Sequence, residues 1–206
     1  IIVGTGSGLS YSELGATHHS LEDMAILRSI PDIRIQAPID SLELVMQLRE
    51  AIEVNGPTYI RIGKKGEKTI HAKSNTLGIS KGQMINQGKD CIILCIGPII
   101  EEAIKARDKL KGDNVDLGIA SLGGIVPLDE NFLKDIISRK YKTWITLEEH
   151  YNIGGLGSTI LEWLNDNKLL NSINLYRMGS PKEFIHELGD QHFTRNQLGL
   201  DANSIV

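Results

Sequence analysis

The stretch Gly88-Lys-Asp-Cys-Ile-Ile-Leu-Cys-Ile-Gly97, followed by the segment Ile99–Lys111, contains the unit from which the fold is built. Its centre, Cys91–Ile96, is a short apolar run bounded by Asp90 and Gly97, which predicts a strand. The segment after it places apolar residues at helical spacing. A strand followed directly by an amphipathic helix is typical of α/β proteins with parallel sheets.

The same alternation continues along the chain in both directions. Further strands are predicted at Ile1–Val3, Ile33–Ala37, Thr58–Ile62, Val115–Ala120, Thr143–Leu147 and Ile173–Arg177. Further helices are predicted at Ser20–Ile30, Ser41–Val54, Glu130–Lys140 and Gly157–Asn165, with a short one near Pro181–Leu188. The pair Asp40-Ser41 and Asp129 supply side-chain oxygens suited to helix N-caps. We therefore predict a three-layer α/β fold with mostly parallel sheets.

The composition is that of a globular protein. The 206 residues are 41% hydrophobic and 23% charged, which argues against disorder and against a fibrous repeat. The formal charge is −4, and no segment concentrates Lys and Arg, so we expect no nucleic-acid partner. The longest apolar run, Cys91–Ile100, is about half of the ~20 residues that a membrane helix needs, so no membrane span is expected.

Cys91 and Cys95 are the only cysteines. On a strand that rises about 3.3 Å per residue they lie ~13 Å apart, too far for a disulfide. Reduced thiols, and a start that lacks a positively charged leader, predict a cytoplasmic protein. Because the chain opens on Ile1-Ile-Val-Gly4 without a methionine, we expect it to be a piece of something longer.

The periodicity fails between Gly63 and Gly88, where charged and polar residues replace the apolar pattern. We place a domain boundary in this region, with a first unit at residues 1–75 and a second at residues 76–206. The second unit is long enough for an independent α/β domain. The first is too short for the sheet to which its strands belong, so we expect it to be truncated on its N-terminal side.

The segment Gly15-Ala-Thr-His-His-Ser-Leu-Glu-Asp23 is the first candidate for ligand binding. It places His18 and His19 in a polar loop that ends at a predicted helix start. Backbone N–H groups and an imidazole in such a loop could meet an anionic or polar ligand. A polar turn with satisfied hydrogen bonds is the structural alternative.

A second candidate follows the strand Thr58–Ile62, which delivers Arg61, Lys64 and Lys65 towards the loop at its C-terminal end. Open α/β sheets bind ligands at that end of their strands. Basic side chains there suit a phosphate or a carboxylate, although a solvated loop would have the same spacing.

Two further segments are interpreted as structural. The run Thr146–Ser158 contains Glu148-Glu-His150 and the glycines of Gly154-Gly-Leu-Gly157, but it lacks the spacing of a dinucleotide or phosphate loop. We interpret it as domain packing or subunit contact; the Glu-Glu-His set would be an acid/base group only if it lined a pocket. The segment Ser121–Asp129 is predicted to be a tight turn.

In combination, these segments resemble the transketolase family. The stretch Gly15–Asp23, Ala37-Pro38 with Asp40, and Gly56-Pro-Thr-Tyr-Ile-Arg61 are similar to the second half of its pyrimidine-binding domain. The segments that resemble its C-terminal domain are Gly88–Gly97, Pro127–Asp129, Glu148–His150, Gly154–Gly157 and Gly199–Asp201.

The resemblance implies a thiamine-diphosphate enzyme that transfers a two-carbon ketol unit from a ketose to an aldehyde. The fold it implies is a truncated thiamine-diphosphate-binding-type domain followed by a transketolase C-terminal domain. It also implies a homodimer, a divalent metal such as Mg, and a small sugar substrate, phosphorylated or unphosphorylated. The family's activating glutamate corresponds to a position upstream of Ile1, and its metal-binding motif to another domain. We therefore expect missing N-terminal domains or a separate N-terminal subunit as partner, and no cofactor binding or activity by this chain alone.

The resemblance also assigns roles to single residues. His18 matches the family's motif histidine, which reaches the reacting oxygen of the substrate, and is the catalytic candidate; His19 beside it is a substrate-binding candidate. Lys64, three residues after the substrate-binding candidate Arg61, falls where many members have an arginine that grips phosphate. A lysine keeps the charge but loses the bidentate fork. Arg28 matches a position that some members use for the acceptor phosphate.

Two departures from the sugar transketolases concern the donor pocket. A histidine twelve residues before His18 and an aspartate four residues before it are replaced here by Gly6 and Leu14. A pocket without those polar groups implies an altered donor or acceptor. The alternatives are a 1-deoxy-xylulose-5-phosphate synthase, which shares Thr17-His-His19, the β subunit of a 2-oxoacid dehydrogenase E1, and a non-catalytic assembly module.

Overall fold

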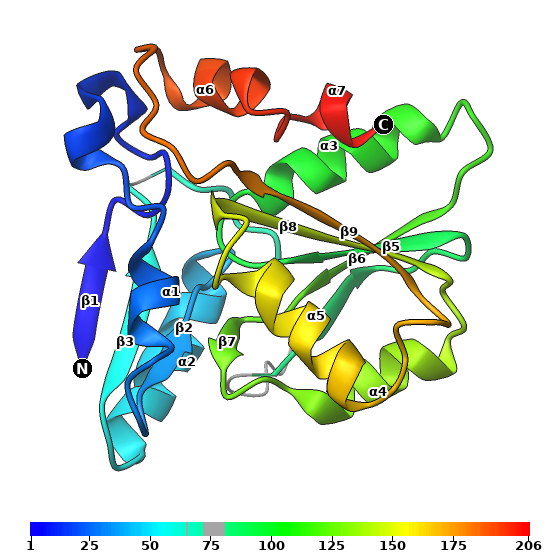
Figure 1. Cartoon of the computed structure of the whole chain (residues 1–206), viewed down its shortest axis with the longest axis horizontal. Helices are drawn as coiled ribbons and strands as arrows, with labels where there is room; N and C mark the ends of the chain where they lie inside the picture. Colours follow the sequence, from blue (N-terminus) through cyan, green and yellow to red (C-terminus); the bar gives the residue numbers. More distant parts are fainter. Residues whose placement is uncertain (65, 72–80) are drawn as a thin grey trace.

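The computed structural model describes residues 1–64, 66–71 and 81–206, which form two sheets with helices packed around them (Figure 1). The first sheet has the order β1-β3-β2-β7 and consists of β1 (Ile2–Thr5), β3 (Thr58–Ile62), β2 (Arg34–Gln36) and β7 (Gly124–Val126). The second has the order β4-β6-β5-β8-β9 and consists of β4 (Gln83–Asn86), β6 (Leu117–Ser121), β5 (Cys91–Cys95), β8 (Thr143–Tyr151) and β9 (Asn174–Ser180).

Parallel pairing dominates both sheets. In the first sheet β3 pairs in parallel with β1 and β2, and in the second β5 pairs in parallel with β6 and β8, and β8 with β9. The two antiparallel strands, β7 and β4, each lie at one edge. The predicted α/β class with mostly parallel sheets is therefore confirmed.

Alternate residues of β5 belong to two hydrophobic clusters, one on each face of the second sheet. Ile92 and Leu94 face a hydrophobic cluster that includes residues of β2, α4 (Glu130–Ser138) and α5 (Leu156–Asp166). Ile93 and Cys95 face the opposite cluster, beneath α3 (Ile100–Leu110) and α7 (Ala202–Ile205). Successive strand residues point to opposite faces, so an unbroken apolar run buries both faces of the second sheet (Figure 1).

The predicted helix starts at Asp40 and Asp129 are confirmed as N-caps. The carboxylate of Asp40 accepts a hydrogen bond of 2.9 Å from the Glu43 N–H at the start of α2 (Ser41–Glu53). Asp129 likewise accepts one of 3.1 Å from the Phe132 N–H in α4. Each cap satisfies one of the N–H groups that a helix leaves unpaired at its start.

The remaining helices differ more from the sequence prediction. The helix expected over Ser20–Ile30 is reduced to α1 (Asp23–Leu27), preceded by two 3-10 turns, η1 (Ser12–Leu14) and η2 (Ala16–His18). The prediction of a short helix near Pro181–Leu188 is wrong, because that segment forms no regular helix.

The short helices α6 (Gln191–Gln197) and α7 and the short strands β4 and β7 were not predicted. The helices α6 and α7 follow the segment after β9, and the side chains of Asp190 and Asp201 cap them. The predicted tight turn at 121–129 instead contains β7, which joins the first sheet beside β2. Lys65 and the expected boundary between residues 75 and 76 lie outside the described residues.

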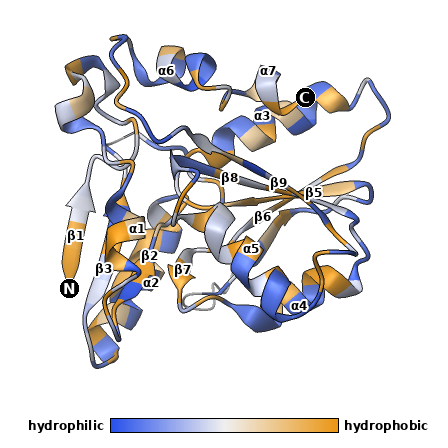
Figure 2. Cartoon of the chain, viewed as in Figure 1, coloured by the Kyte–Doolittle hydropathy of each residue, from blue (hydrophilic) through white to orange (hydrophobic). Residues whose placement is uncertain are grey.

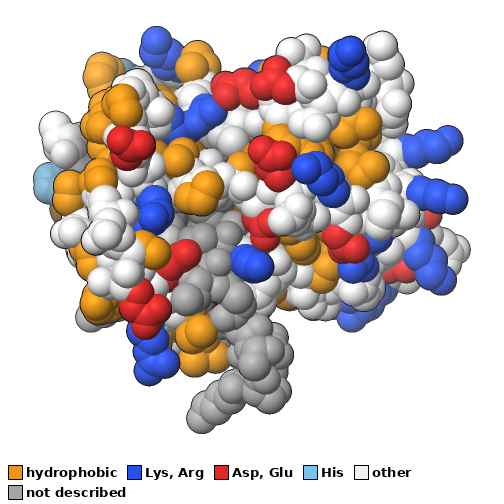
Figure 3. All heavy atoms as spheres, turned by 90° about the horizontal axis from the view of Figure 1, so that it is seen from below, with side chains coloured by type: hydrophobic (Ala, Val, Ile, Leu, Met, Phe, Trp, Pro, Cys, Tyr) orange, Lys and Arg blue, Asp and Glu red, His pale blue; other side chains and the backbone are white. Residues whose placement is uncertain are grey.

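Hydrophobic side chains remain exposed on the side of the molecule where β1 and α2 lie (Figure 3). Figure 2 shows the hydrophobic start of β1, at the N-terminus, on the same side. The most exposed of them include Ile2 at 59% and Ile52 at 69%. On α2 the exposed residues Val45, Leu48 and Ile52 follow helical spacing, so they form one stripe. Among the described residues, no helix is both long and apolar enough to cross a membrane.

Replacing Glu43 by glutamine is expected to make stability less sensitive to pH. The Glu43 carboxylate is buried, accepts hydrogen bonds from the Ile39 N–H at 2.6 Å and the Ser121 hydroxyl at 3.1 Å, and burial raises its pKa to about 7. Because its pKa is higher in the folded than in the unfolded state, Glu43 contributes to the free energy of unfolding at low pH. This contribution is lost as the pH rises from the ordinary pKa of 4.5 through the folded-state pKa of about 7. The group's contribution should fall by about 3 kcal/mol over this window.

Denaturant unfolding of the wild type and of Glu43→Gln at pH 5 and pH 8 measures this difference. The exposed carboxylate of Glu130, replaced in the same way, is the control, and its variant should follow the wild type at both pH values. Parallel pH profiles for the wild type and Glu43→Gln would contradict the prediction.

Candidate functional site

The candidate site is built around a loop at the C-terminal end of β1. We call residues 9–19 the histidine loop. Its base is closed by two backbone hydrogen bonds, from the Gly8 N–H to the Ser20 carbonyl (3.1 Å) and from the Ser20 N–H to the Gly8 carbonyl (3.0 Å). The Ser7 N–H also donates to the Ile62 carbonyl at 2.9 Å, which continues the pairing of β1 with β3. The loop therefore starts where both strands end.

The path into this loop needs glycine at position 6. Gly6 has a φ of +80°, a conformation that favours glycine, and a Cβ atom built there would lie 2.4 Å from the ring of Tyr11. A histidine side chain at this position would have to displace the tyrosine. Leu14, in η1, is 52% exposed. Both positions at which the chain departs from the sugar transketolases thus lie in or beside the histidine loop.

His18 and His19 have different surroundings in the loop. His18 is exposed in η2, and its Nδ1 atom lies 3.0 Å from the Thr17 hydroxyl. His19 is half-buried and its Nε2 atom lies 3.4 Å from the Ser12 carbonyl, across the loop. The structure therefore presents the imidazole of His18 to the outside, whereas His19 contacts the loop itself.

Lys64 contacts the same loop from the end of β3. Its ammonium forms an ion pair of 2.9 Å with Glu13 and lies 4.7 Å from the centre of the Tyr11 ring. A polar hollow of about 190 Å³ adjoins it, lined by Ser10, Lys64, Gly66, Glu67, Pro98, Glu101, Gln191 and Arg195. Lys64 thus meets the histidine loop at Tyr11 and Glu13, two residues that precede the predicted binding segment Gly15–Asp23.

Arg61 lies beneath the loop and is only 3% exposed. Its Nε atom donates to the Asp23 carboxylate at 2.8 Å, and its Nη2 atom donates to the carbonyls of Ser20 and, at 2.8 Å, Glu149. Burial opposes ionisation of Asp23, but the Arg61 charge and the hydrogen bonds from Arg61 and Tyr59 outweigh it and lower the pKa of Asp23. In this structure the guanidinium joins β3, the loop base and β8.

The guanidinium of Arg28 contacts α5 and the residues before it, and not the histidine loop. It donates to the Gly154 carbonyl at 3.0 Å and pairs with Glu162 of α5 at 2.5 Å. Its side chain is 19% exposed. Arg28 therefore joins α1 to the glycine-rich start of α5, and its role towards an acceptor phosphate stays a prediction.

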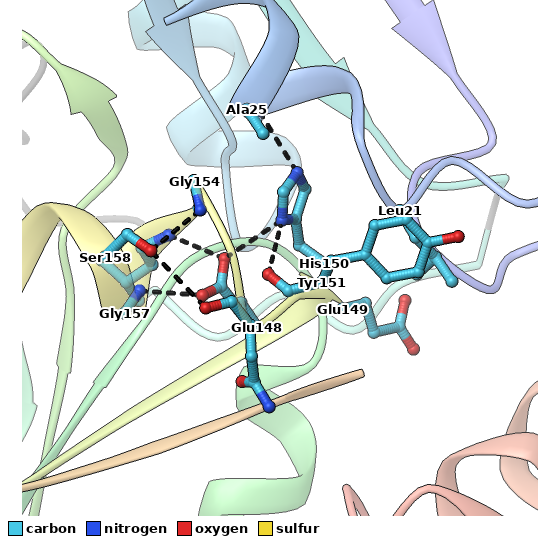
Figure 4. Close-up of polar contacts among 12 residues, drawn as sticks. Leu21, Ala25, Glu148, Glu149, His150, Tyr151, Gly154, Gly157 and Ser158 are labelled. Atoms are coloured by element: carbon cyan, nitrogen blue, oxygen red, sulfur yellow. Dashed lines mark hydrogen bonds and ion pairs between the residues drawn. The ribbon is translucent and has the colours of Figure 1, made fainter. Parts of the chain in front are cut away.

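The buried Glu148 lies at the N-terminus of α5 (Figure 4). Its carboxylate accepts hydrogen bonds from the N–H groups of Leu156 at 2.7 Å and Gly157 at 2.8 Å. A carboxylate is stabilised there by unpaired N–H groups and the helix dipole. Burial nevertheless raises the pKa of Glu148 to about 7.

His150 points away from Glu149 and towards α1 (Figure 4). Its Nε2 atom accepts a hydrogen bond of 3.3 Å from the Ala25 N–H, and its Nδ1 atom donates to the Tyr151 carbonyl at 2.9 Å. Burial, with the nearby charge of Arg61, lowers the pKa of His150 to about 4. These contacts support the domain-packing interpretation of Glu148-Glu-His150, which sequence spacing could not separate from an acid/base set.

Sequence reasoning did not identify Arg195 as a partner of this region. It lies on α6, is buried, and contacts Glu149 at 2.5 Å and Glu102 of α3 at 3.5 Å. No motif marks it, because its partners lie 46 and 93 residues away in the sequence. Among the described residues, no group of three or more His, Cys, Asp or Glu residues could hold a metal ion.

Comparison with known proteins identifies both segments of the chain. Residues 1–66 match the family described as transketolase, pyrimidine binding domain, and residues 80–205 match the family described as transketolase, C-terminal domain. A 1-deoxy-D-xylulose-5-phosphate synthase from Caldanaerobacter subterraneus subsp. tengcongensis is 35% identical over 94% of this chain and 31% of its own length. A protein described as a transketolase C-terminal section, from Methanocaldococcus jannaschii, is 32% identical over all of this chain and 63% of its own length.

Solved structures show the same fold. One, titled as a split gene transketolase in an inactive beta4 tetramer, matches with a TM-score of 0.83 and 25% identity over all of this chain and 63% of its own length. The transketolase of Campylobacter jejuni matches with a TM-score of 0.75 over 30% of its length. The chain spans about a third of the length of the synthase and under two thirds of that of the C-terminal section. It belongs to the transketolase family.

Proposed function

We propose that the chain is the C-terminal part of a thiamine-diphosphate-dependent transketolase-type enzyme, which transfers a two-carbon ketol unit from a ketose to an aldehyde. The observation that carries this proposal is the match of the whole chain to a transketolase C-terminal section and to a split gene transketolase. The domain division at 1–75 and 76–206 belongs to the same proposal.

The exposed apolar side near β1 and α2 supports a further part of the enzyme as partner. Ile2, Val3, Val45, Leu48 and Ile52 leave apolar surface in water that a contact would bury. Among the described strands, β1 pairs only with β3, so its other edge is free to accept a strand. The partner is the section that carries the remaining cofactor-binding residues, on the same polypeptide or as a separate subunit, within a homodimeric cytoplasmic enzyme.

The cofactor is assigned to a site that this chain completes rather than forms alone. We assign the ligands of the divalent metal and of the diphosphate to the part of the enzyme that precedes this chain, as the family resemblance implies. Bound thiamine diphosphate supplies the nucleophilic carbon and accepts the electrons of the broken carbon–carbon bond. The isolated chain is proposed to be inactive, and the split gene relative is itself titled as inactive.

The residues of this chain act on the substrate. His18, exposed on its loop, would hold or move a proton at the reacting oxygen of the substrate. His19 would support substrate binding by holding the shape of the histidine loop, through its contact with the Ser12 carbonyl. Lys64 would attract a substrate phosphate as a point charge, and the negative charge of Glu13 beside it would weaken that attraction. Arg61 would support substrate binding indirectly, because its guanidinium holds the Ser20 carbonyl at the base of the loop.

A 1-deoxy-D-xylulose-5-phosphate synthase is the second candidate. The 35% identical relative with that name and the shared Thr17-His-His19 favour it. Gly6 and Leu14, which replace polar groups of the sugar transketolases, are compatible with it as well. The candidates differ in their donor, because a synthase of this kind would accept pyruvate, whereas a transketolase would accept ketose phosphates or unphosphorylated ketoses.

Titration calorimetry with thiamine diphosphate and Mg²⁺ tests the proposal. We expect the complete protein to bind both and the chain alone to bind neither. Turnover of ketose phosphates, unphosphorylated ketoses and pyruvate by the complete protein then separates the two candidates. A complete, folded protein that bound no cofactor would overturn both and would favour a non-catalytic assembly module.

A further inference from the structure

The strand β8 presents two consecutive carboxylates to different parts of the molecule (Figure 4). Glu148 binds the start of α5 through backbone N–H groups. Glu149, one residue later, points away from that helix towards the histidine loop and α6. Neighbouring strand residues point to opposite faces, so the same residue type serves two separate contacts.

The carboxylate of Glu149 is buried and has partners on three sides. It accepts hydrogen bonds from the Leu9 N–H at 3.3 Å and from the Gln191 amide at 3.1 Å, and it pairs with the Arg195 guanidinium at 2.5 Å. Arg195 is held in turn by Glu102 at 3.5 Å. Leu9 meets one oxygen of this carboxylate and Arg195 the other, while the Gln191 amide reaches both. The carboxylate as a whole is therefore held from α6 and, through Arg195, from α3, elements far from the loop in sequence.

The base of the histidine loop is packed directly against Glu149. Gly8 has a φ of +59°, and a Cβ atom built on it would lie 2.5 Å from the Glu149 Cβ and 2.9 Å from the Glu149 carbonyl oxygen. On the other side of the base, Arg61 donates to the carbonyls of Ser20 and Glu149. Both ends of the loop are thus attached to the same residue of β8, one directly and one through Arg61.

We propose that Glu149 is a positioning residue that sets the place of the histidine loop, and with it the imidazole of His18. The loop leaves the sheet through Gly8 and Leu9 and returns at Ser20, so a shift of its base moves everything between them. The consequence for turnover rests on the proposed function, whereas the consequence for the loop does not. A displacement of about 1 Å in a residue that orients substrate can change rates by ~10²-fold.

The test compares Glu149→Gln with Glu148→Gln in the complete protein. The two variants replace the same type of carboxyl group by an amide at adjacent, buried positions, but only Glu149 contacts the loop. A glutamine at 149 places an amide donor against the Leu9 N–H or the Arg195 guanidinium, so one of these contacts must be lost. Gln191→Ala is the milder variant, which removes one donor from Glu149 if the first variant does not fold.

Three readouts follow the loop and the reaction separately. In Glu149→Gln we expect amide hydrogen exchange of residues 9–19 to accelerate about tenfold, as expected when a local opening becomes easier. The Cε1–H resonance of His18 should shift, and kcat should fall about tenfold with a smaller change in KM for the donor, because a displaced proton-transfer group acts in the transition state. Glu148→Gln should leave all three unchanged.

Unchanged exchange and an unchanged His18 resonance in Glu149→Gln would overturn the proposal, whatever the activity. Equal effects of both variants would overturn it too, because they would indicate general destabilisation. A wild-type protein without turnover would refute the proposed function, and the exchange and resonance measurements would still decide the role of Glu149.

Discussion

Replacing Arg61 by methionine is expected to lower the free energy of unfolding by about 3–5 kcal/mol, the cost of breaking a buried ion pair by removing one partner. Methionine fills much of the volume but donates no hydrogen bond. Asp23, whose side chain is only 16% exposed, would lose its charged partner, and the carbonyls of Ser20 and Glu149 would lose a donor. The pKa of Asp23 should then rise, because the charge that lowers it is gone.

Denaturant unfolding followed by circular dichroism measures this loss. Arg139→Met is the matched control, because Arg139 pairs with Asp135 at 2.9 Å on the surface of α4, where such pairs contribute about 0–1 kcal/mol. Arg61→Lys should lie between the two, since lysine keeps the charge but cannot reach three acceptors in a fixed fork. Equal losses in Arg61→Met and Arg139→Met would show that the buried network contributes little.

The main strands and helices could be predicted because local pattern and tertiary structure agree there. Thr58–Ile62 has the predicted bounds, and Cys91–Ile96 differs from β5 by one residue. The elements that were missed are short and depend on distant partners. β7 is three residues long and pairs with β2, about 90 residues earlier in the sequence. The helix α6 depends on a cap at Asp190 and on the contact of its own Arg195 with Glu149 of β8.

The candidate site was predictable only in part for the same reason. The histidines and Lys64 lie in loops whose polar residues stand out between apolar segments. Sequence spacing suggested that Arg61 binds substrate, but it could not show that this side chain is buried beneath the loop. Glu148 and Glu149 are adjacent and identical in type, so their separate contacts could come only from the direction of the strand and the packing around it.

Replacing His18 by alanine is expected to lower kcat/KM of the complete enzyme by about 10²–10⁴-fold, the range typical of a lost proton-transfer group. The imidazole is exposed, and within residues 1–64, 66–71 and 81–206 its hydrogen-bond partner is the neighbouring Thr17 hydroxyl, so it is available to a substrate. Because little packing is lost, the free energy of unfolding should stay within about 0.5 kcal/mol of the wild type. Steady-state kinetics and denaturant unfolding together measure both effects.

His192→Ala is the control, since His192 is also an exposed histidine but lies on α6. Its activity should match the wild type, and His18→Asn should remain closer to His18→Ala than to the wild type, because an amide can donate a hydrogen bond but cannot carry the proton. If His18→Asn were fully active, the imidazole would serve only to shape the loop. If His18→Ala and His192→Ala lost activity equally, neither proton transfer nor substrate contact could be assigned to His18.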